Sequence, residues 1–223
     1  GDPDRLRALA IDFVHHYERR LEEGATLKGK AMFVCSKRDI AYAFFQEVIK
    51  LRPQWNEVLA SEEGVELTEQ EQKTIKPIER IKMIMTRSKD DPKALYDLLG
   101  NKDDRKELDR QFKNAKSNFK IAIVVDMWLT GFDVPFLDTM YIDKPIQRHN
   151  LIQTISRVNR KFEGKEKGLV VDYIGIKKQM NLALAHYNKA DQQNIEEINQ
   201  SIVVVKDHLD LIGKMFHSFD KSP

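Results

Sequence analysis

The stretch KIAIVVD at residues 120–126 decides the fold, and it runs directly into WLTGFDVP at residues 128–135. Hardly a polar side chain interrupts it between Ile121 and Val125, which is typical of a strand buried on both faces, as parallel sheets require. In open α/β sheets ligands bind beyond the carboxyl ends of the strands, and a Thr-Gly pair there lets backbone and a hydroxyl approach a ligand closely. We therefore expect a functional loop directly after this strand.

Four further apolar stretches predict strands, and charged or helical patterns separate them. The first of them, residues 30–35, is followed at once by a helical apolar stripe from Ile40 to Leu51, and together they make half of a βαβ crossover. The fold class predicted is therefore α/β, a parallel sheet flanked by helices. The four stretches are KAMFVC at 30–35, IKMIM at 81–85, LDTMYI at 137–142 and GLVVDYI at 168–174.

Composition allows one α/β domain with a smaller appendage, since the chain has 223 residues. Its net charge of +2 neither demands nor excludes a polyanionic partner. The single cysteine, Cys35, lies in an apolar stretch, so we expect a core residue in a reducing compartment and no metal site. Because no apolar stretch reaches the length of a membrane span and the amino end lacks a signal-peptide pattern, we expect a cytoplasmic protein without a membrane partner.

The helical pattern HNLIQTISRVNRK at residues 149–161 carries two arginines on one face. Gln153, Arg157 and Arg160 follow one another at spacings of four and three, so they line one side of the helix, while apolar residues line another. Two guanidinium groups on one face suit an anion, because each forks onto phosphate oxygens in a planar geometry. The alternative is a solvated helix face.

The loop TGFD at 130–133 and the helix segment SRVNR at 156–160 together resemble motifs V and VI of the superfamily 2 helicases and translocases. DMWLTGFD at 126–133, DKP at 143–145 and VDYIG at 171–175 narrow the resemblance to the motor of type I restriction enzyme restriction subunits. It implies the second RecA-like lobe of an ATP-dependent double-stranded DNA translocase, part of a type I site-specific deoxyribonuclease.

The resemblance also implies roles for individual residues in a cleft between two lobes. Arg157 and Arg160 would reach the β- and γ-phosphates of ATP held by the first lobe, and Gln153 would help to register the nucleotide. Gly131 and Asp133 would meet the ribose or couple nucleotide to DNA. The residue before the first arginine is a serine where many members of the superfamily have glycine, which leaves the division of labour between the arginines open.

Two loops that follow predicted strands are candidates for contact with DNA phosphates. Backbone N–H groups at a helix start, beside cations, favour phosphate, and the resemblance makes the first loop motif IV, which contacts the nucleic acid backbone. Ser36 could instead serve only as a helix cap, with its neighbours solvated. The candidates are Ser36, Lys37 and Arg38, then Thr86, Arg87 and Ser88, and also Thr130 after the central strand.

The domain organisation predicted has three parts. Residues 1–24 form a packing helix capped by Asp2, residues 25–176 form the RecA-like lobe, and residues 177–223, with two amphipathic helical patterns, start a helical domain. Residues 52–78 carry an acidic tract without a sustained apolar period, so we expect a surface insertion that faces away from DNA. The whole looks like a fragment of a longer chain.

Neither a Gly-x-x-x-x-Gly-Lys-Ser/Thr loop nor a strand ending in Asp-Glu is present in the sequence. The resemblance therefore places the ATP cradle and the Mg²⁺ ligands on a first RecA-like lobe of the same subunit, and the isolated chain is expected not to hydrolyse ATP. The nuclease domain, the methyltransferase and specificity subunits and double-stranded DNA are the other partners it implies. Two alternatives stay open: a lobe of another superfamily 2 helicase, acting on RNA or DNA, and a nucleotide-independent module that docks an acidic protein.

Overall fold

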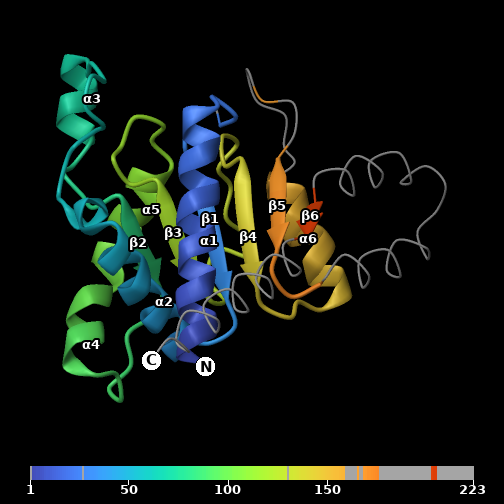
Figure 1. Cartoon of the computed structure of the whole chain (residues 1–223). Coiled ribbons are helices and arrows are strands. Elements are labelled where there is room, and N and C mark those ends of the chain that lie inside the picture. The colour runs from blue at the N-terminus through green and yellow to red at the C-terminus, as the bar shows by residue number, and fades with distance from the viewer. Residues whose placement is uncertain are drawn as a thin grey trace, which may run out of the picture.

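The structure is a computed structural model, and it describes residues 2–26, 28–129, 131–158, 165, 168–175 and 202–204. These residues form a six-stranded parallel sheet with the strand order β2-β3-β1-β4-β5-β6 (Figure 1). The predicted α/β class, a parallel sheet flanked by helices, is confirmed. The strands are β1 (Ala31–Cys35), β2 (Ile81–Ile84), β3 (Ile121–Val124), β4 (Thr139–Asp143), β5 (Leu169–Asp172) and β6 (Ile202–Val204).

The strand that decides the fold, β3, lies inside the sheet between β2 and β1. Its four residues are all buried, as are the five residues of β1, in which Ala31 pairs with Ile121 on one side and Thr139 on the other. Helices cover both faces of these strands, so neither face alternates with polar residues, which is why the sequence reads as unbroken apolar runs. Cys35, at the end of β1, is buried and has a free thiol.

One face of the sheet is covered by α1 (Pro3–Glu22), α2 (Arg38–Leu51) and α4 (Lys93–Leu99) (Figure 1). Helix α1 begins as the sequence predicts, because the Asp2 side chain accepts a hydrogen bond from Asp4 N and Pro3 occupies the first turn. Phe13 of α1 and Phe44 of α2 meet Phe33 of β1, with ring centroids 5.2 Å and 3.9 Å away. This aromatic contact anchors both helices on the sheet.

The other face is covered by α5 (Lys102–Phe112) and α6 (Arg148–Val158), together with the segment between β3 and β4. Leu151, Ile155 and Val158 of α6 are buried there, as the predicted apolar stripe requires. The molecule therefore has three layers, helices on either side of one sheet. Within the residues that the structure describes, no helix is both long and apolar enough to cross a membrane.

The predicted surface insertion holds two short helices, η1 (Pro53–Asn56) and α3 (Glu69–Thr74). Trp55 is buried in the core, and Leu59 and Ile78 exchange backbone hydrogen bonds of 3.1 Å and 2.9 Å. A capping box begins α3, since the Thr68 side chain accepts from Glu71 N and the Glu71 side chain accepts from Thr68 N. The segment is thus more ordered than its lack of an apolar period indicates.

Two predictions about local structure are wrong. Residues 202–204, predicted as part of a helix, form β6, which pairs in parallel with β5 and extends the sheet; the other residues of 177–223 lie outside the described residues. Ser36 does not cap α2, because the helix begins at Arg38 and Lys37 is its capping residue, without a side-chain cap. The extended backbone of Lys37, with φ −143° and ψ 161°, shifts the helix start one residue beyond the predicted cap.

Candidate functional site

All strands of a parallel sheet end at the same edge, so the loops after β1 to β5 gather at the carboxyl edge of this sheet (Figure 1). Every predicted site residue that the structure describes belongs to one of these loops, to the first turn of α2 or to α6. Thr130 and Arg160 lie outside the described residues.

Arg38 joins the loop after β1 to the loop after β2. Its guanidinium donates to both carboxylate oxygens of Asp91, at 2.7 Å and 2.6 Å, and to Thr86 O at 2.5 Å. Asp91 also accepts a hydrogen bond from Ser88 N at 2.6 Å. Desolvation alone would raise the pKa of the Asp91 carboxyl group, but the hydrogen bonds from Arg38 and Ser88 N, together with the charge of Arg38, outweigh it and lower the pKa. The fork predicted to face DNA phosphate therefore binds protein groups, and it fixes the two loops relative to each other.

The other candidates for DNA contact differ in exposure. Lys37 and Thr86 are exposed, whereas Ser36, Arg87 and Ser88 are half-buried. Arg87 lies over the Tyr96 ring, with its guanidinium carbon 4.3 Å from the centroid, so its side chain is directed by α4. Lys37 is consequently the most accessible cation among these described candidates.

The loop after β3 has a strained start. Trp128 has φ 68°, a left-handed conformation that bulky residues rarely adopt. Its ring stacks on Phe132 at 4.0 Å with an interplanar angle of 4°. Along the chain, Gly131 lies between Trp128 and Phe132 and has φ 75°, and Asp133 follows Phe132. Both residues are exposed. Strain of this kind persists only where surrounding contacts hold it, and it concentrates at functional loops.

Arg157 supplies such a contact, because it ties α6 to this loop. Its Nε donates to Leu129 O at 3.0 Å, and a terminal nitrogen donates to Phe132 O. Gln153, one turn earlier, is exposed, and its backbone carbonyl oxygen accepts a hydrogen bond from the Ser156 hydroxyl at 2.8 Å. The structure thus brings Arg157 into contact with the loop that contains Gly131 and Asp133, and it places Gln153 on the same helix as Arg157.

Two further cations at this edge were not predicted to have a role. Arg5 of α1 pairs with the buried carboxylate of Asp143 at the end of β4, and this hydrogen bond raises the pKa of Arg5. Lys144 donates to Val125 O at 2.7 Å and pairs with Asp126, which links the loops after β4 and β3. Both partners of Lys144 lie in motifs quoted above, but only the register of the sheet places them side by side.

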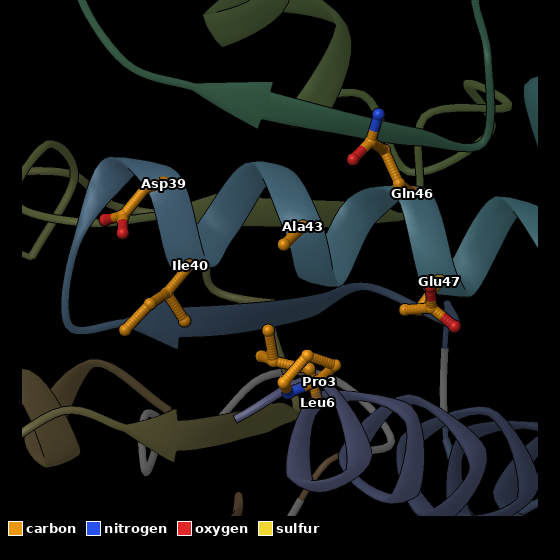
Figure 2. A pocket seen from close by; sticks show the side chains of 7 residues that line it. All are labelled: Pro3, Leu6, Asp39, Ile40, Ala43, Gln46 and Glu47. Atoms are coloured by element: carbon orange, nitrogen blue, oxygen red, sulfur yellow. The ribbon is translucent and has the colours of Figure 1, made fainter. Parts of the chain in front are cut away.

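A hollow of about 330 Å³ lies beside this edge, between the start of α1 and α2 (Figure 2). Asp39 and Glu47 at its rim make it unsuitable for a phosphate, and none of the predicted nucleotide residues lines it. The described residues contain no group of three or more His, Cys, Asp or Glu side chains that could hold a metal ion. The lining residues are Pro3, Leu6, Asp39, Ile40, Ala43, Gln46 and Glu47.

Comparison with known proteins places this geometry in a family. The family described as type I restriction enzyme subunit R domain 3 matches residues 27–175. The chain is 35% identical to the type I restriction enzyme HindI endonuclease subunit of Haemophilus influenzae, over 97% of this chain and 19% of that protein. It is 34% identical to the putative type I restriction enzyme MjaIXP endonuclease subunit of Methanocaldococcus jannaschii, over 86% of this chain and 16% of that protein. The chain thus spans less than a fifth of the length of these relatives.

A solved structure supports the fold. The fragment structure of a putative HsdR subunit of a type I restriction enzyme from Vibrio vulnificus YJ016 superposes with a TM-score of 0.52 at 13% identity, over 80% of this chain and 28% of that one. The RecA-like class expected for the sheet is confirmed with it. Because the family match covers well over half of the 223 residues, the chain belongs to the type I restriction enzyme R-subunit family, with residues 27–175 as domain 3.

Proposed function

We propose that this chain is the second motor lobe of an ATP-dependent double-stranded DNA translocase within a type I restriction endonuclease subunit. The observation that carries the proposal is the contact of Arg157 with the loop after β3, at Leu129 O and Phe132 O. It joins the arginine-bearing helix to the Thr-Gly-containing loop at the carboxyl edge of a parallel sheet, the edge where α/β proteins bind their ligands.

The arginines of α6 are proposed to face ATP bound by a first lobe of the same subunit. Arg157 uses two of its five N–H donors on the loop, and the remaining donors suit a phosphate oxygen. Arg160 is proposed to contact the γ-phosphoryl group, Gln153 to register the nucleotide, and Gly131 with Asp133 to meet the ribose or couple it to DNA. ATP with Mg²⁺ would supply the phosphoryl transfer, on metal ligands proposed to lie in the first lobe.

The loops after β1 and β2 are proposed to follow the DNA backbone. Lys37 is exposed beside the first turn of α2, where backbone N–H groups also favour phosphate. Arg38 is proposed to act mainly by holding the two loops together through Asp91 and Thr86 O. The remaining proposed contacts are Ser36, Thr86, Arg87, Ser88 and Thr130.

The partners proposed are those of the whole enzyme: double-stranded DNA, the nuclease domain of the same subunit, and the methyltransferase and specificity subunits. Membership of the R-subunit family supports DNA over RNA as the track. The internal contacts of Arg157 make an arginine face that docks an acidic protein the weaker alternative.

Arg160 provides the test, in the full-length R subunit. An arginine that stabilises charge on the γ-phosphoryl group in the transition state affects turnover more than ATP affinity. We expect Arg160→Ala to lower DNA-stimulated ATP turnover by about 10³–10⁵-fold with little change in ATP affinity, and Arg160→Lys to stay close to Arg160→Ala, since lysine lacks the planar fork. Arg110→Ala, on an exposed arginine of α5, is the matched control. Near-parental turnover in either Arg160 variant would contradict the proposal.

A further inference from the structure

The loop after β3 is held at two points by cations that come from two other elements. Its far part is bound by Arg157 of α6 through two backbone carbonyl groups. Its first residues are bound by Lys144, directly after β4, whose ammonium group donates to Val125 O at 2.7 Å and pairs with Asp126. The loop is therefore fixed on both sides of Trp128, whose left-handed backbone, with φ 68°, persists only under such contacts.

The two contacts of Lys144 differ in strength. The side chain of Lys144 is 18% exposed, but that of Asp126 is 83% exposed, so solvent screens the ion pair and the pair contributes little. Val125 is buried, and its carbonyl oxygen accepts a hydrogen bond from a charged donor. Such charge-assisted bonds are roughly twice as strong as neutral ones. The bond to Val125 O is consequently the stronger of the two contacts.

The backbone of Lys144 is fixed by its neighbours in the chain. Asp143, which precedes it, pairs in register with Cys35 of β1, and its buried carboxylate accepts from both terminal nitrogens of Arg5 in α1. Pro145, which follows it, disfavours a helical backbone at Lys144. The contact with the loop therefore orders only the side chain of Lys144, which limits its entropic cost.

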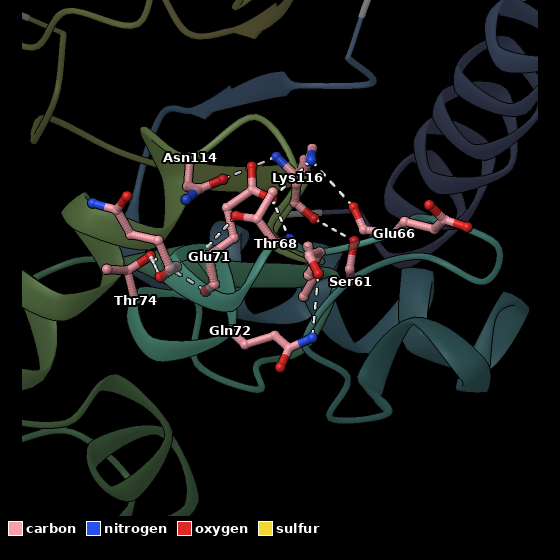
Figure 3. Close-up of polar contacts among 10 residues, drawn as sticks. Ser61, Glu66, Thr68, Glu71, Gln72, Thr74, Asn114 and Lys116 are labelled. Carbon is pink, nitrogen blue, oxygen red and sulfur yellow. Dashed lines mark hydrogen bonds and ion pairs between the residues drawn. The ribbon is translucent and has the colours of Figure 1, made fainter.

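The opposite end of β3 carries a lysine with the same kind of contact (Figure 3). Lys116, in the segment that enters β3, donates to Glu66 O at 3.1 Å and pairs with the Glu71 carboxylate at 2.8 Å. Lys116 thus binds one backbone carbonyl and one carboxylate at the amino edge of the sheet, and Lys144 does so at the carboxyl edge. The two lysines differ in their place along β3 and not in the kind of bond that they make.

We propose that Lys144 is a positioning residue of the motor, which acts through Val125 O to hold the loop after β3 in the conformation that engages DNA. The inference rests on the proposed function, because that function assigns contacts with DNA and ribose to residues of this loop. Strain at Trp128 opposes the closed loop, so the closed form depends on its two cation contacts. A loop that is only partly closed lowers the apparent affinity for DNA by the closed fraction.

Hydrogen–deuterium exchange of the full-length R subunit, measured without nucleotide or DNA, tests the contact itself. Lys144→Met keeps the apolar stem and removes the ammonium group. We expect amide exchange in the peptide 126–134 to become faster by about tenfold, the factor that the loss of one charge-assisted hydrogen bond gives. Lys116→Met is the matched control and should leave this peptide at the parental rate. Parental exchange in Lys144→Met, or the same increase in Lys116→Met, would overturn the proposal.

ATP turnover as a function of DNA concentration tests the positioning role. Lys144→Met should raise the DNA concentration that gives half-maximal stimulation by up to about tenfold, and turnover at saturating DNA should change less, because excess DNA closes the loop. A loss of folded subunit would instead lower turnover at every DNA concentration without shifting the half-saturation point. Lys144→Arg, which keeps a charged donor, and Asp126→Asn, which keeps the bond to Val125 O, should both stay near the parental half-saturation point. An unshifted value in Lys144→Met, or an equal shift in Asp126→Asn, would contradict the assignment.

Arg160→Ala, measured in the same assay, separates this inference from the proposed function. Its expected effect is on turnover at saturating DNA, whereas the expected effect of Lys144→Met is on the half-saturating DNA concentration. Parental turnover in Arg160→Ala beside a shifted half-saturation point in Lys144→Met would contradict the nucleotide role of Arg160 and support the positioning role of Lys144. The reverse combination would support the motor function and overturn the positioning role.

Discussion

Removal of the Arg157 side chain should release the loop after β3. Arg157 donates to Leu129 O and Phe132 O from a half-buried position. A hydrogen bond from a charged group contributes about 1.5–3 kcal/mol when it is buried, and partial exposure reduces this by about half, so the two bonds together hold the loop by about 1.5–3 kcal/mol. Arg157→Ala should therefore shift the ratio of closed to open loop by about 10–150-fold.

Trp128 makes this change measurable, because it is one of two tryptophans in the chain and lies in the loop itself. With Trp55, which is buried in the core, replaced by phenylalanine, emission reports on Trp128 alone. We expect Arg157→Ala to shift the emission to longer wavelength and to increase quenching by acrylamide, as the stack with Phe132 opens. Arg157→Lys should give about half the effect, since an ammonium group can reach one of the two carbonyls.

The control for this experiment is Arg110→Ala, which removes an arginine with 70% exposed side chain and a surface ion pair to Glu107. Surface pairs contribute about 0–1 kcal/mol, so the emission of Trp128 should not change. If Arg157→Ala left both the emission and the quenching of Trp128 at the parental values, the contact with Leu129 O and Phe132 O would not be what holds the strained loop.

Three further predictions address stability, DNA and chemistry. Burial lowers the pKa of Lys165 from 10.5 to about 8. Between these two pH values the unfolded chain binds more protons than the folded chain, so the free energy of unfolding rises with pH across that window. Lys165→Met should therefore reduce the rise in the urea unfolding midpoint between pH 8 and pH 10. In DNA titrations Lys37→Ala should weaken binding and lower the salt slope by about 1, whereas Arg38→Ala and Asp91→Ala should resemble each other in DNA affinity and salt slope. If the double variant Lys37→Ala with Arg38→Ala kept the parental affinity and salt slope, the DNA would bind elsewhere on the domain. The isolated chain should show no Mg²⁺-dependent ATP turnover above a blank, and turnover abolished by Arg160→Ala would contradict this.

Much of the sheet could be predicted because burial on both faces leaves an unambiguous apolar run. β1 and β3 lie within predicted stretches, and α6 buries the apolar face that its periodicity indicated. β6 could not be separated from a helix by periodicity, since Ile202 fits a helical stripe. The missed signal is the β-branched run from Ile202 to Val205, because such side chains lose rotamer freedom in a helix and favour strands.

The candidate site was predictable only as a set of loops. That residues after β1, β2 and β3 share one edge follows from a parallel sheet, but which side chain contacts which partner does not. Arg38 and Asp91 are 53 residues apart in sequence, and Arg157 is 28 residues from Leu129. Pairings over such distances depend on strand order and on the lengths of connections, which residue types and local spacing do not encode.

The strand order shows why these cations have structural roles. Arg38 follows β1 and reaches the loop after β2, although β3 lies between these strands, and Lys144 follows β4 and reaches the end of β3 across β1. Each therefore bridges an intervening strand and neutralises an acid on the far side, Asp91 or Asp126. Because Arg38 and Lys144 are neutralised by Asp91 and Asp126, their positive charges contribute little to the attraction of a polyanion. We therefore expect the loops to be positioned by arginine and lysine pairs, and the attraction of phosphate to rest on Lys37 and on backbone N–H groups, which makes DNA binding by this domain alone weak and strongly dependent on salt.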